Sequence, residues 1–264
     1  MRCGYTSVPS PLNPVAIAEE LSNSYYADPM PRTDGGMMNG ADITPLIAQA
    51  PLADGYRFEL LDRAAIGTLI SFVATWFPDI RVGGASCYLR EDFYAKKVFF
   101  DDARRGDVLV LLLKRGEELA GMFSCEFDGV TLSIYAGLGV VAPPHRGANL
   151  AQAGITFTET IGRHLGMGLA YGMATLKAPH AQRAFERAGW QLIGISPGYD
   201  REMVAPGVIK RVYEAVYAKV LVTDADLLQP QPQNLTPRTQ AFFDRVFTAP
   251  QFDHPRILEH APTS

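Results

Sequence analysis

The clearest fold signal in the chain is the run Leu132-Ser-Ile-Tyr-Ala-Gly-Leu-Gly-Val-Val-Ala-Pro-Pro-His-Arg-Gly-Ala-Asn-Leu-Ala151. Its first ten residues read as a strand. Pro143 and Pro144 end this strand, because proline has no N–H to donate to a sheet ladder. Arg146 and Gly147 then open a helix. The run therefore predicts a strand, a turn and a helix in that order.

The helix is expected from Ala148 onward. Its apolar residues recur at three- and four-residue spacing and mark one buried face: Leu150, Ala153, Phe157, Ile161 and Leu165. The first four N–H groups of a helix have no internal partner, and the helix dipole adds positive charge there, so backbone alone can bind a phosphate. The small residues Gly147, Ala148 and Ala151 leave room, and Arg146 adds a charge. The turn thus indicates a pyrophosphate site.

These residues resemble the acyl-CoA signature of the GCN5-related N-acetyltransferase superfamily, which reads Arg or Gln, two residues, Gly, one residue, then Gly or Ala. The matching residues here are Arg146, Gly147, Ala148, Asn149, Leu150 and Ala151. Asn149 replaces the usual central glycine, and asparagine is the non-glycine residue that best tolerates unusual backbone angles. The segment 178–190 resembles the short helix and Gly-aromatic turn that flank bound CoA in that family, and Val141 to Pro143 resembles its lead-in.

The resemblance implies an α/β fold with a mixed, mostly antiparallel central sheet flanked by helices, over residues 56–222. Strands are expected at 56–61, 107–114, 119–128, 131–141, 168–176, 190–196 and 208–222, with a loop at 197–207. Asp62 is expected to cap a helix with a stripe at Ile66, Leu69, Ile70, Val73 and Phe77. Another helix is expected over 88–101. An unrelated α/β domain with a simple strand-to-helix turn is the alternative.

Two flanks lie outside this match. Residues 1–55 contain six acidic and two basic residues and are rich in Pro and Gly, so we expect an irregular acidic arm with a helix only at 15–21. Residues 223–264 are expected to form a C-terminal extension with a short amphipathic helix at 236–247. Its apolar side, at Phe242, Phe243, Val246 and Phe247, would need a partner surface in cis or across a homodimer.

Composition restricts the function classes. The chain has 264 residues, a net charge of −4 and 47% hydrophobic residues, which is ample for the core of one α/β domain. The three cysteines, Cys3, Cys87 and Cys125, show no metal or redox spacing, and reduced thiols in the cytoplasm fit best. No targeting segment or membrane span is visible, and a mildly acidic chain is a poor candidate for nucleic acid. No metal site is expected.

The chemistry implied by the resemblance is transfer of an acyl group from acetyl-CoA, or another acyl-CoA, to an amine by direct attack in a ternary complex. Backbone groups of Val140 and Val141 are the expected partners of the carbonyl oxygen and the pantetheine arm. Ser133 stands where some members carry a glutamate base, and Phe185, beside the expected CoA site, stands where many carry a tyrosine acid. Loss of the acid need not abolish turnover, because a thiol is a fair leaving group.

Other residues are candidates for the missing base. Tyr135 lies two residues from Ser133 on one strand face, and Glu126 and Asp128 end the neighbouring strand. Each also has a structural interpretation, as a core aromatic for Tyr135 and as a solvated hairpin for the two carboxylates. Further residues considered are Cys125 as a core residue, His145 near the phosphate or on the surface, His164, His180 at a helix start, and Tyr199, Asp200 and Arg201 beside the acceptor.

The sequence thus favours an acyl-CoA-dependent N-acetyltransferase that acts on a small-molecule amine. Two alternatives stay open. The first is a non-catalytic, CoA-binding member of the fold, which the missing Glu and Tyr favour. The second is an enzyme that uses a longer acyl donor, for which the small residues Ala136, Gly137, Gly139 and Gly172 would leave room.

Overall fold

The computed structural model describes residues 40–100 and 106–248. The chain divides into two compact units, with the boundary between Val222 and Thr223. The first unit contains the sheet and the helices packed on it, and the second contains the C-terminal helix. Each is described by itself.

Seven strands form one sheet in the order β1-β2-β3-β4-β5-β7-β6. Neighbouring strands are antiparallel, except that β4 and β5 run parallel. The strands are β1 (Tyr56–Leu60), β2 (Val108–Arg115), β3 (Glu118–Asp128), β4 (Ser133–Val141), β5 (Leu169–Thr175), β6 (Gln191–Ala205) and β7 (Val208–Val220). The expected mixed, mostly antiparallel sheet is confirmed.

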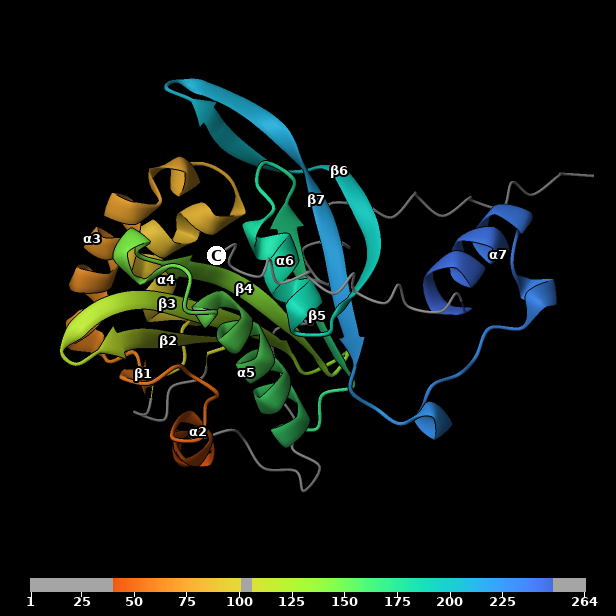
Figure 1. Ribbon diagram of the computed structural model, residues 1–264, viewed down its shortest axis with the longest axis horizontal. Helices are drawn as coiled ribbons and strands as arrows, with labels where there is room; N and C mark the ends of the chain where they lie inside the picture. The colour runs from red at the N-terminus through yellow and green to blue at the C-terminus, as the bar shows by residue number, and fades with distance from the viewer. Residues whose placement is uncertain (1–39, 101–105, 249–264) are drawn as a thin grey trace, which may run out of the picture. The chain divides into compact units, whose positions relative to one another are not determined.

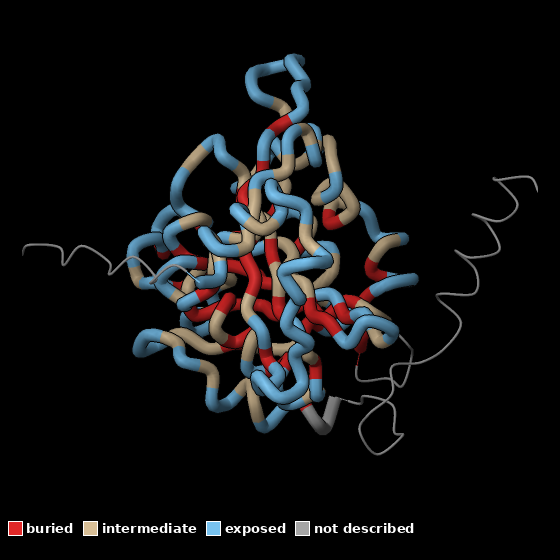
Figure 2. Tube along the Cα trace, turned by 90° about the vertical axis from the view of Figure 1, so that its right-hand side faces the viewer, coloured by how far each residue is buried: buried red, intermediate tan, exposed pale blue. Residues whose placement is uncertain are grey.

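Helices cover both faces of this sheet (Figure 1). They are α2 (Gly40–Ile47), α3 (Ile66–Trp76), α4 (Glu91–Lys97), α5 (Leu150–His164) and α6 (His180–Arg187). Helices α2, α5 and α6 pack on one face, and α3 and α4 with the 3₁₀ helix η3 (Gly84–Leu89) pack on the other. The buried residues follow the strands between these layers, whereas the tip of the β6–β7 hairpin is exposed (Figure 2).

The core on the α5 face is built by the apolar stripe that the sequence predicts. Leu150, Ala153, Phe157 and Ile161 are buried, and Leu165 is half-buried. The ring of Phe157 stacks on Phe58 of β1 with 5.3 Å between ring centroids. Burial of such a side chain contributes about 2–3 kcal/mol.

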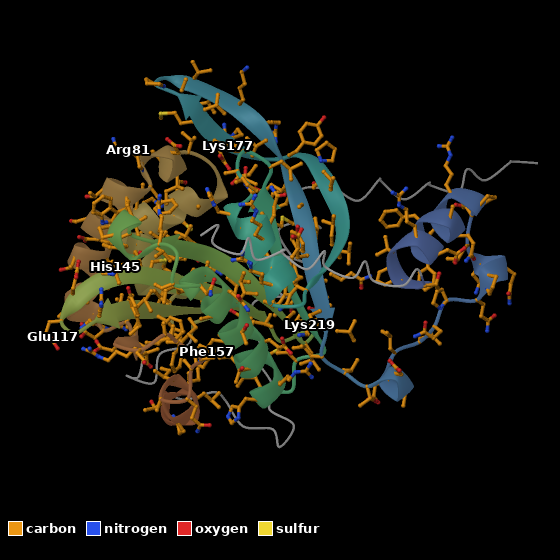
Figure 3. All side chains as sticks on the ribbon, in the orientation of Figure 1. Arg81, Glu117, His145, Phe157, Lys177 and Lys219 are labelled. Carbon is orange, nitrogen blue, oxygen red and sulfur yellow. The ribbon has the colours of Figure 1, made fainter. Side chains whose placement is uncertain are left out.

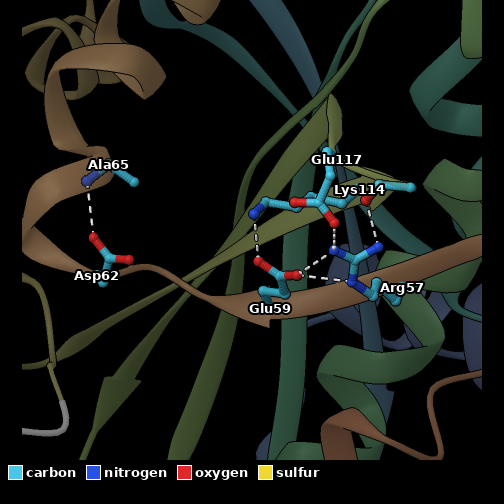
Figure 4. A network of polar contacts seen from close by, with 7 residues as sticks. Arg57, Glu59, Asp62, Ala65, Lys114 and Glu117 are labelled. Atoms are coloured by element: carbon cyan, nitrogen blue, oxygen red, sulfur yellow. Dashed lines mark hydrogen bonds and ion pairs between the residues drawn. The ribbon is translucent and has the colours of Figure 1, made fainter.

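The β1 edge is held by polar contacts on the surface (Figure 4). Arg57 and Lys114 both pair with Glu59, at 2.7 and 2.6 Å, which joins β1 to β2. Asp62 accepts a hydrogen bond of 2.9 Å from the N–H of Ala65, so the predicted cap is confirmed. It caps a 3₁₀ turn, η1 (Arg63–Ala65), which leads into α3.

Two predictions of local structure are wrong. The helix expected at 88–101 is broken, because Arg90 has extended angles between η3 and α4, and Val98 forms a bridge with Val108. The loop expected at 197–207 is mostly strand. Strand β6 runs through Pro197 to Ala205 with two register shifts, which an edge strand tolerates because one side of its backbone needs no partner.

The flanks differ in part from expectation. The helix expected at 15–21 lies outside the described residues. Within the acidic arm, α2 is helical although Pro45 lies inside it. In the second unit, α7 (Pro237–Phe243) continues as a π-helical turn, Asp244–Thr248, so a helix is present where one is expected.

Residues 40–100 and 106–248 contain neither a membrane-spanning helix nor a cluster of metal-ligating side chains. No helix in these ranges is both long and apolar enough to cross a membrane. Within the same ranges, no group of three or more His, Cys, Asp or Glu side chains is arranged to hold a metal ion.

Candidate functional site

The sheet opens between β4 and β5. The two strands pair only from Ser133 with Leu169 to Ala136 with Gly172. Beyond this point β4 continues to Val141 and β5 to Thr175, and the ladder between them has ended. Along its C-terminal half, the edge of β4 that faces β5 therefore pairs with no strand among residues 40–100 and 106–248.

A bulge in β4 begins at the same place. The pairing with β3 shifts between Phe123 and Cys125, so that Ser124 lies opposite two residues of β4. The hydroxyl of Ser124 accepts a hydrogen bond of 2.8 Å from the N–H of Leu138 and lies 2.6 Å from the hydroxyl of Tyr88. This buried network gives the backbone N–H of the bulge a hydrogen-bond partner, and it lies where β4 and β5 stop pairing.

The backbone direction after the bulge identifies the free groups. The N–H of Ala142 donates to the carbonyl of Ala120 on β3, at 2.9 Å. Because N–H directions alternate along an antiparallel strand, the N–H of Val140 also points toward β3, so Val140 does not offer the N–H that was expected to pair with the pantetheine arm. The N–H groups of Gly139 and Val141 then point toward β5. Arg146 Nε reaches back to the carbonyl of Val141 at 3.2 Å.

The turn after β4 contains two residues with positive φ. Gly147 has φ 93°, with no atom within 4 Å of where a Cβ would lie. Asn149 has φ 55° and ψ 21°, a left-handed conformation that asparagine tolerates. Because of this residue α5 begins at Leu150 rather than at Ala148. Arg146 is exposed beside the turn, with its guanidinium 5.8 Å from the ring centroid of Phe77.

The first turn of α5 presents unpaired donors. The first hydrogen bond that enters the helix runs from the N–H of Ala153 to the carbonyl of Asn149, at 3.0 Å. The N–H groups of Leu150, Ala151 and Gln152 come before it, and the side chain of Asn149 makes no capping bond. We call the segment Arg146–Ala151 the cradle. Its open space, positive charge and free amides fit a pyrophosphate.

Helix α6 lies next to the cradle, as the order of the motifs implies. Gln152 donates to the carbonyl of Arg187 at 3.2 Å, and Arg187 donates to the Asn149 side chain at 3.4 Å. The ring of Phe185 is buried and reaches the opening of the sheet. A Cβ added to Gly172 would lie 2.5 Å from the tip of this ring, so Phe185 fills the space beside the last β4–β5 pair.

No protein-family model matches the sequence, and no curated protein matches it significantly. Among solved structures, a ribosomal L7/L12 α-N-protein acetyltransferase in complex with coenzyme A matches with a TM-score of 0.52 at 12% identity, over 67% of this chain and 99% of that chain. The chain has the GCN5-related N-acetyltransferase fold. A spermidine N-acetyltransferase from Vibrio cholerae in complex with CoA and spermine has a TM-score of 0.50 at 12% identity, over 64% of this chain and 97% of that chain.

Within this acetyltransferase fold, the candidate base Tyr135 lies at the last β4–β5 pairs. It pairs with Tyr171, and the two ring centroids are 5.1 Å apart. Glu126 lies opposite Tyr135 on β3 and is exposed. Burial and the nearby carboxylates of Glu214 and Glu126 raise the pKa of Tyr135, so its phenol stays neutral and is a poor base.

The other candidates have structural partners. Ser133 lies at the opposite end of β4 from the cradle, and its hydroxyl is 2.8 Å from that of Thr131. Asp128 accepts hydrogen bonds from the N–H groups of Val130 and Thr131 in the exposed hairpin, as its structural interpretation predicts. Cys125 is buried in the core, and burial raises the pKa of its thiol.

The three histidines that the structure describes lie at separate places in the fold. His145 is buried rather than on the surface; its ring nitrogens lie 3.1 Å from the Tyr56 hydroxyl and 3.1 Å from a carboxylate oxygen of Glu118 (Figure 3). It therefore ties the end of β4 to β1 and β3. His164 is the exposed last residue of α5, and His180 is the first residue of α6.

The segment Tyr199 to Arg201 lies on β6 rather than in a loop. Asp200 accepts hydrogen bonds from the N–H of Gly84 at 3.0 Å through both carboxylate oxygens, which fastens η3 to β6. Lys177, after β5, lies 2.7 Å from Glu202 and 3.5 Å from Asp79 (Figure 3). These contacts attach the α3 side of the domain to β6.

Sequence reasoning missed Glu214 on β7. It is buried, with 9% of its surface exposed, and lies opposite Thr175 of β5 and Ser196 of β6. Burial, followed by the negative charges of Asp200 and Glu202, raises its pKa to about 7. No local signal marked it, because this strand also contains Lys210, Arg211 and Lys219, and one more charged residue does not stand out in it.

Proposed function

We propose that the protein transfers an acyl group, by default acetyl, from acyl-CoA to a small-molecule amine in a ternary complex. The observation that carries this proposal is the opening between β4 and β5, which ends at Ala136 and Gly172 and leads to the free amides of the cradle. The fold is that of the two acetyltransferases with CoA described above, which supports the same donor here.

Each part of the donor has a matching group in the chain. In the proposal, Arg146 and the amides of Leu150 and Ala151 hold the pyrophosphate, and Gly147 keeps the approach open. The free β4 edge at Gly139 and Val141 pairs with the pantetheine amides. Acyl-CoA supplies the thioester carbonyl, and the N–H of Val141 is the donor for its oxygen as negative charge develops.

The acceptor is proposed to approach from the α3 side of the sheet. On that side α3 and α4 cover β2, β3 and the end of β4, but Glu126 is exposed and Tyr135, Tyr171 and Met173 are only half-buried. An amine on this face would meet the thioester where β4 and β5 part. Donor and acceptor would then reach the reacting carbon from different sides, as direct attack requires.

A CoA-binding protein without catalysis is the second candidate. It is favoured by Ser133 and Phe185, which occupy the positions where the family resemblance leads one to expect a base and an acid. A longer acyl donor is disfavoured on the α6 side, because the ring of Phe185 fills the space at Gly172.

A thiol-release assay decides between the candidates. Acetyl-CoA is incubated with the full chain and a set of primary amines, and free CoA thiol is measured together with the acetylated amine. Formation of both in equal amounts supports transfer. Tight binding of acetyl-CoA without release of thiol for any amine would support the non-catalytic candidate instead.

We further propose a cytoplasmic homodimer that uses the C-terminal extension. In that unit Phe242 and Phe247 are each about half exposed, at 51% and 50%. The double variant Phe242→Ser/Phe247→Ser should halve the mass measured by light scattering. An unchanged mass would contradict this contact.

A further inference from the structure

We infer that Glu214 takes the proton from the acceptor amine, and that this amine carries no anionic group near its reactive nitrogen. The inference rests on the proposed acyl transfer. It concerns the face of the sheet on the α3 side, where Glu214 of β7 lies opposite Thr175, on the part of β5 that continues beyond its last pair with β4.

Strand register places Glu214 on the same face as Tyr135. Tyr135 is opposite Tyr171, and Thr175 is opposite Glu214. Tyr171 and Thr175 are four residues apart on β5 and so point to the same face, and residues opposite each other on paired strands also share a face. Burial raises the pKa of Tyr135, and the negative charge of Glu214 raises it further, in agreement with this shared face.

The fold leaves Glu214 unpartnered. Its neighbours on this face are occupied: Asp200 accepts two N–H···O contacts from Gly84, and Glu202 is paired with Lys177. Glu214 is 9% exposed, and its carboxylate makes no hydrogen bond or ion pair with any residue that the structure describes. Most of the side chain is buried, but its carboxylate oxygens are not among the buried polar atoms that lack a partner, so they keep contact with solvent and are open to an amine.

The charges around Glu214 suit proton transfer. The titratable and charged groups around Glu214 and the two tyrosines of this face include Glu126, Asp128, Tyr135, Tyr171, Lys177, Tyr199, Asp200 and Glu202. Lys177 is shared between Glu202 and Asp79, so the surplus charge is negative. Burial and this surplus raise the pKa of Glu214 to about 7, the range in which a general base works best near neutral pH.

Both protons that the ammonium group loses in the reaction have an acceptor. The ammonium form of the acceptor gives one proton to the Glu214 carboxylate, which becomes the neutral acid. The free amine attacks the thioester carbon, the C–N bond forms and the C–S bond breaks. The remaining extra amine proton passes through solvent to the departing CoA thiolate, and Glu214 returns its proton to solvent.

The same charges restrict the acceptor. A protonated amine is attracted to the negative face, whereas an acceptor with a carboxylate beside the amine is repelled by Glu126, Glu214 and their neighbours. We therefore expect n-butylamine to be acetylated at least about tenfold more efficiently, in kcat/KM, than 2-aminopentanoate, which is n-butylamine with a carboxylate on the carbon that carries the nitrogen.

The kinetic test compares Glu214→Gln with the wild type, using acetyl-CoA and n-butylamine. The glutamine keeps the shape but cannot take a proton, so kcat/KM near neutral pH should fall about one hundredfold and recover at high pH, where the free amine is abundant. Glu117→Gln is the matched control, because Glu117 lies in the exposed β2–β3 turn with 93% of its side chain exposed. Unchanged kcat/KM in Glu214→Gln would overturn the inference.

A second readout needs no donor or acceptor. Glu214 has a raised pKa in the folded state, so its stability contribution is present below about pH 4.5 and is lost as the pH rises through about 7. Glu214→Gln should therefore unfold at a higher temperature than the wild type at about pH 8 and at the same temperature at about pH 4. Equal unfolding temperatures at both pH values would contradict the buried, unpartnered carboxylate.

The outcomes separate this inference from the proposed function. If acetyl-CoA does not bind, the acyltransferase proposal fails. If acetyl-CoA binds but n-butylamine releases no thiol, the assigned acceptor face is wrong, because a small unhindered amine at high concentration needs little more than the proton acceptor. If transfer occurs and Glu214→Gln is as active as Glu117→Gln, only the role of Glu214 is wrong.

Discussion

The cradle and the proposed acceptor face, on the α3 side of the sheet, are built differently. The cradle is one continuous segment, Arg146–Ala151, and offers mostly backbone N–H groups. The acceptor face combines side chains from four strands, with Glu126 on β3, Tyr135 on β4, Tyr171 on β5 and Glu214 on β7. Residues 126 and 214 are far apart in sequence.

The two sites therefore constrain the sequence differently. A backbone site needs only the right angles at a few positions, such as the positive φ of Gly147 and Asn149. A side-chain site depends on the residue type at each position of several strands. The donor site is therefore expected to be recognisable across distant sequences, and the acceptor site to be particular to each chain.

The largest expected effect comes from the cradle. Arg146→Glu/Gly147→Val places negative charge beside the pyrophosphate and forces valine into a left-handed conformation, so affinity for CoA should fall at least about one hundredfold, or about 2.7 kcal/mol. Titration calorimetry measures this. The matched control is Arg115→Glu/Gly116→Val, since Gly116 also has a positive φ, 57°, in open space. Equal affinity losses in both variants would contradict a site at the cradle.

The next effect concerns the bulge that separates the two regions. Ser124→Ala removes the acceptor of the Leu138 N–H and the partner of the Tyr88 hydroxyl, both in a buried setting. The free energy of unfolding should drop by about 1–3 kcal/mol, measured by chemical denaturation. Ser71→Ala on exposed α3 should change it by less than about 0.5 kcal/mol. If Ser124→Ala is equally mild, the hydroxyl does not hold the bulge.

A smaller effect is expected at Phe185, which lies on the α6 side of the opening between β4 and β5. Phe185→Leu replaces the ring that fills the space at Gly172 with a shorter side chain. The kcat/KM ratio of octanoyl-CoA to acetyl-CoA should therefore rise by about tenfold. Competition between the two donors, monitored by mass of the acylated amine, measures the ratio. A ratio that stays at the wild-type value would show that the acyl chain does not reach Phe185.

The smallest effect is expected at Tyr135 on the acceptor face. Tyr135→Phe keeps the ring contact with Tyr171 and removes only the hydroxyl. Because a neutral phenol with a raised pKa is a poor base, kcat/KM should fall less than about tenfold at neutral pH. A loss as large as that of Glu214→Gln would assign proton transfer to Tyr135 instead.

Much of the fold follows from local sequence patterns. The stripe on α5 and the apolar runs of β2 and β3 predict their elements closely, because helix and strand periods are local properties. The long strand β6 does not follow, since Pro197 and Gly198 indicate a loop. Only its position at the edge of the sheet, beside β7, allows these residues in a strand.

Some features of the candidate site also follow from local sequence, whereas others depend on which strands are neighbours. Residue type alone indicates that Asn149 tolerates the left-handed angles that it adopts, but not that the helix begins after it. The direction of the N–H of Val140 toward β3 depends on the pairing that Ala142 makes. Glu214 is invisible until β5, β6 and β7 are placed together. Its raised pKa arises from burial and from Asp200 and Glu202, which no single segment brings together.

The most direct test of the central claim is a calorimetric titration of the full chain with acetyl-CoA and with CoA. A donor site at the cradle predicts micromolar binding of both ligands at one site per chain, with loss of the signal in Arg146→Glu/Gly147→Val. An absence of binding by the wild type would contradict the claim and would reduce the Arg146 segment to a simple strand-to-helix turn.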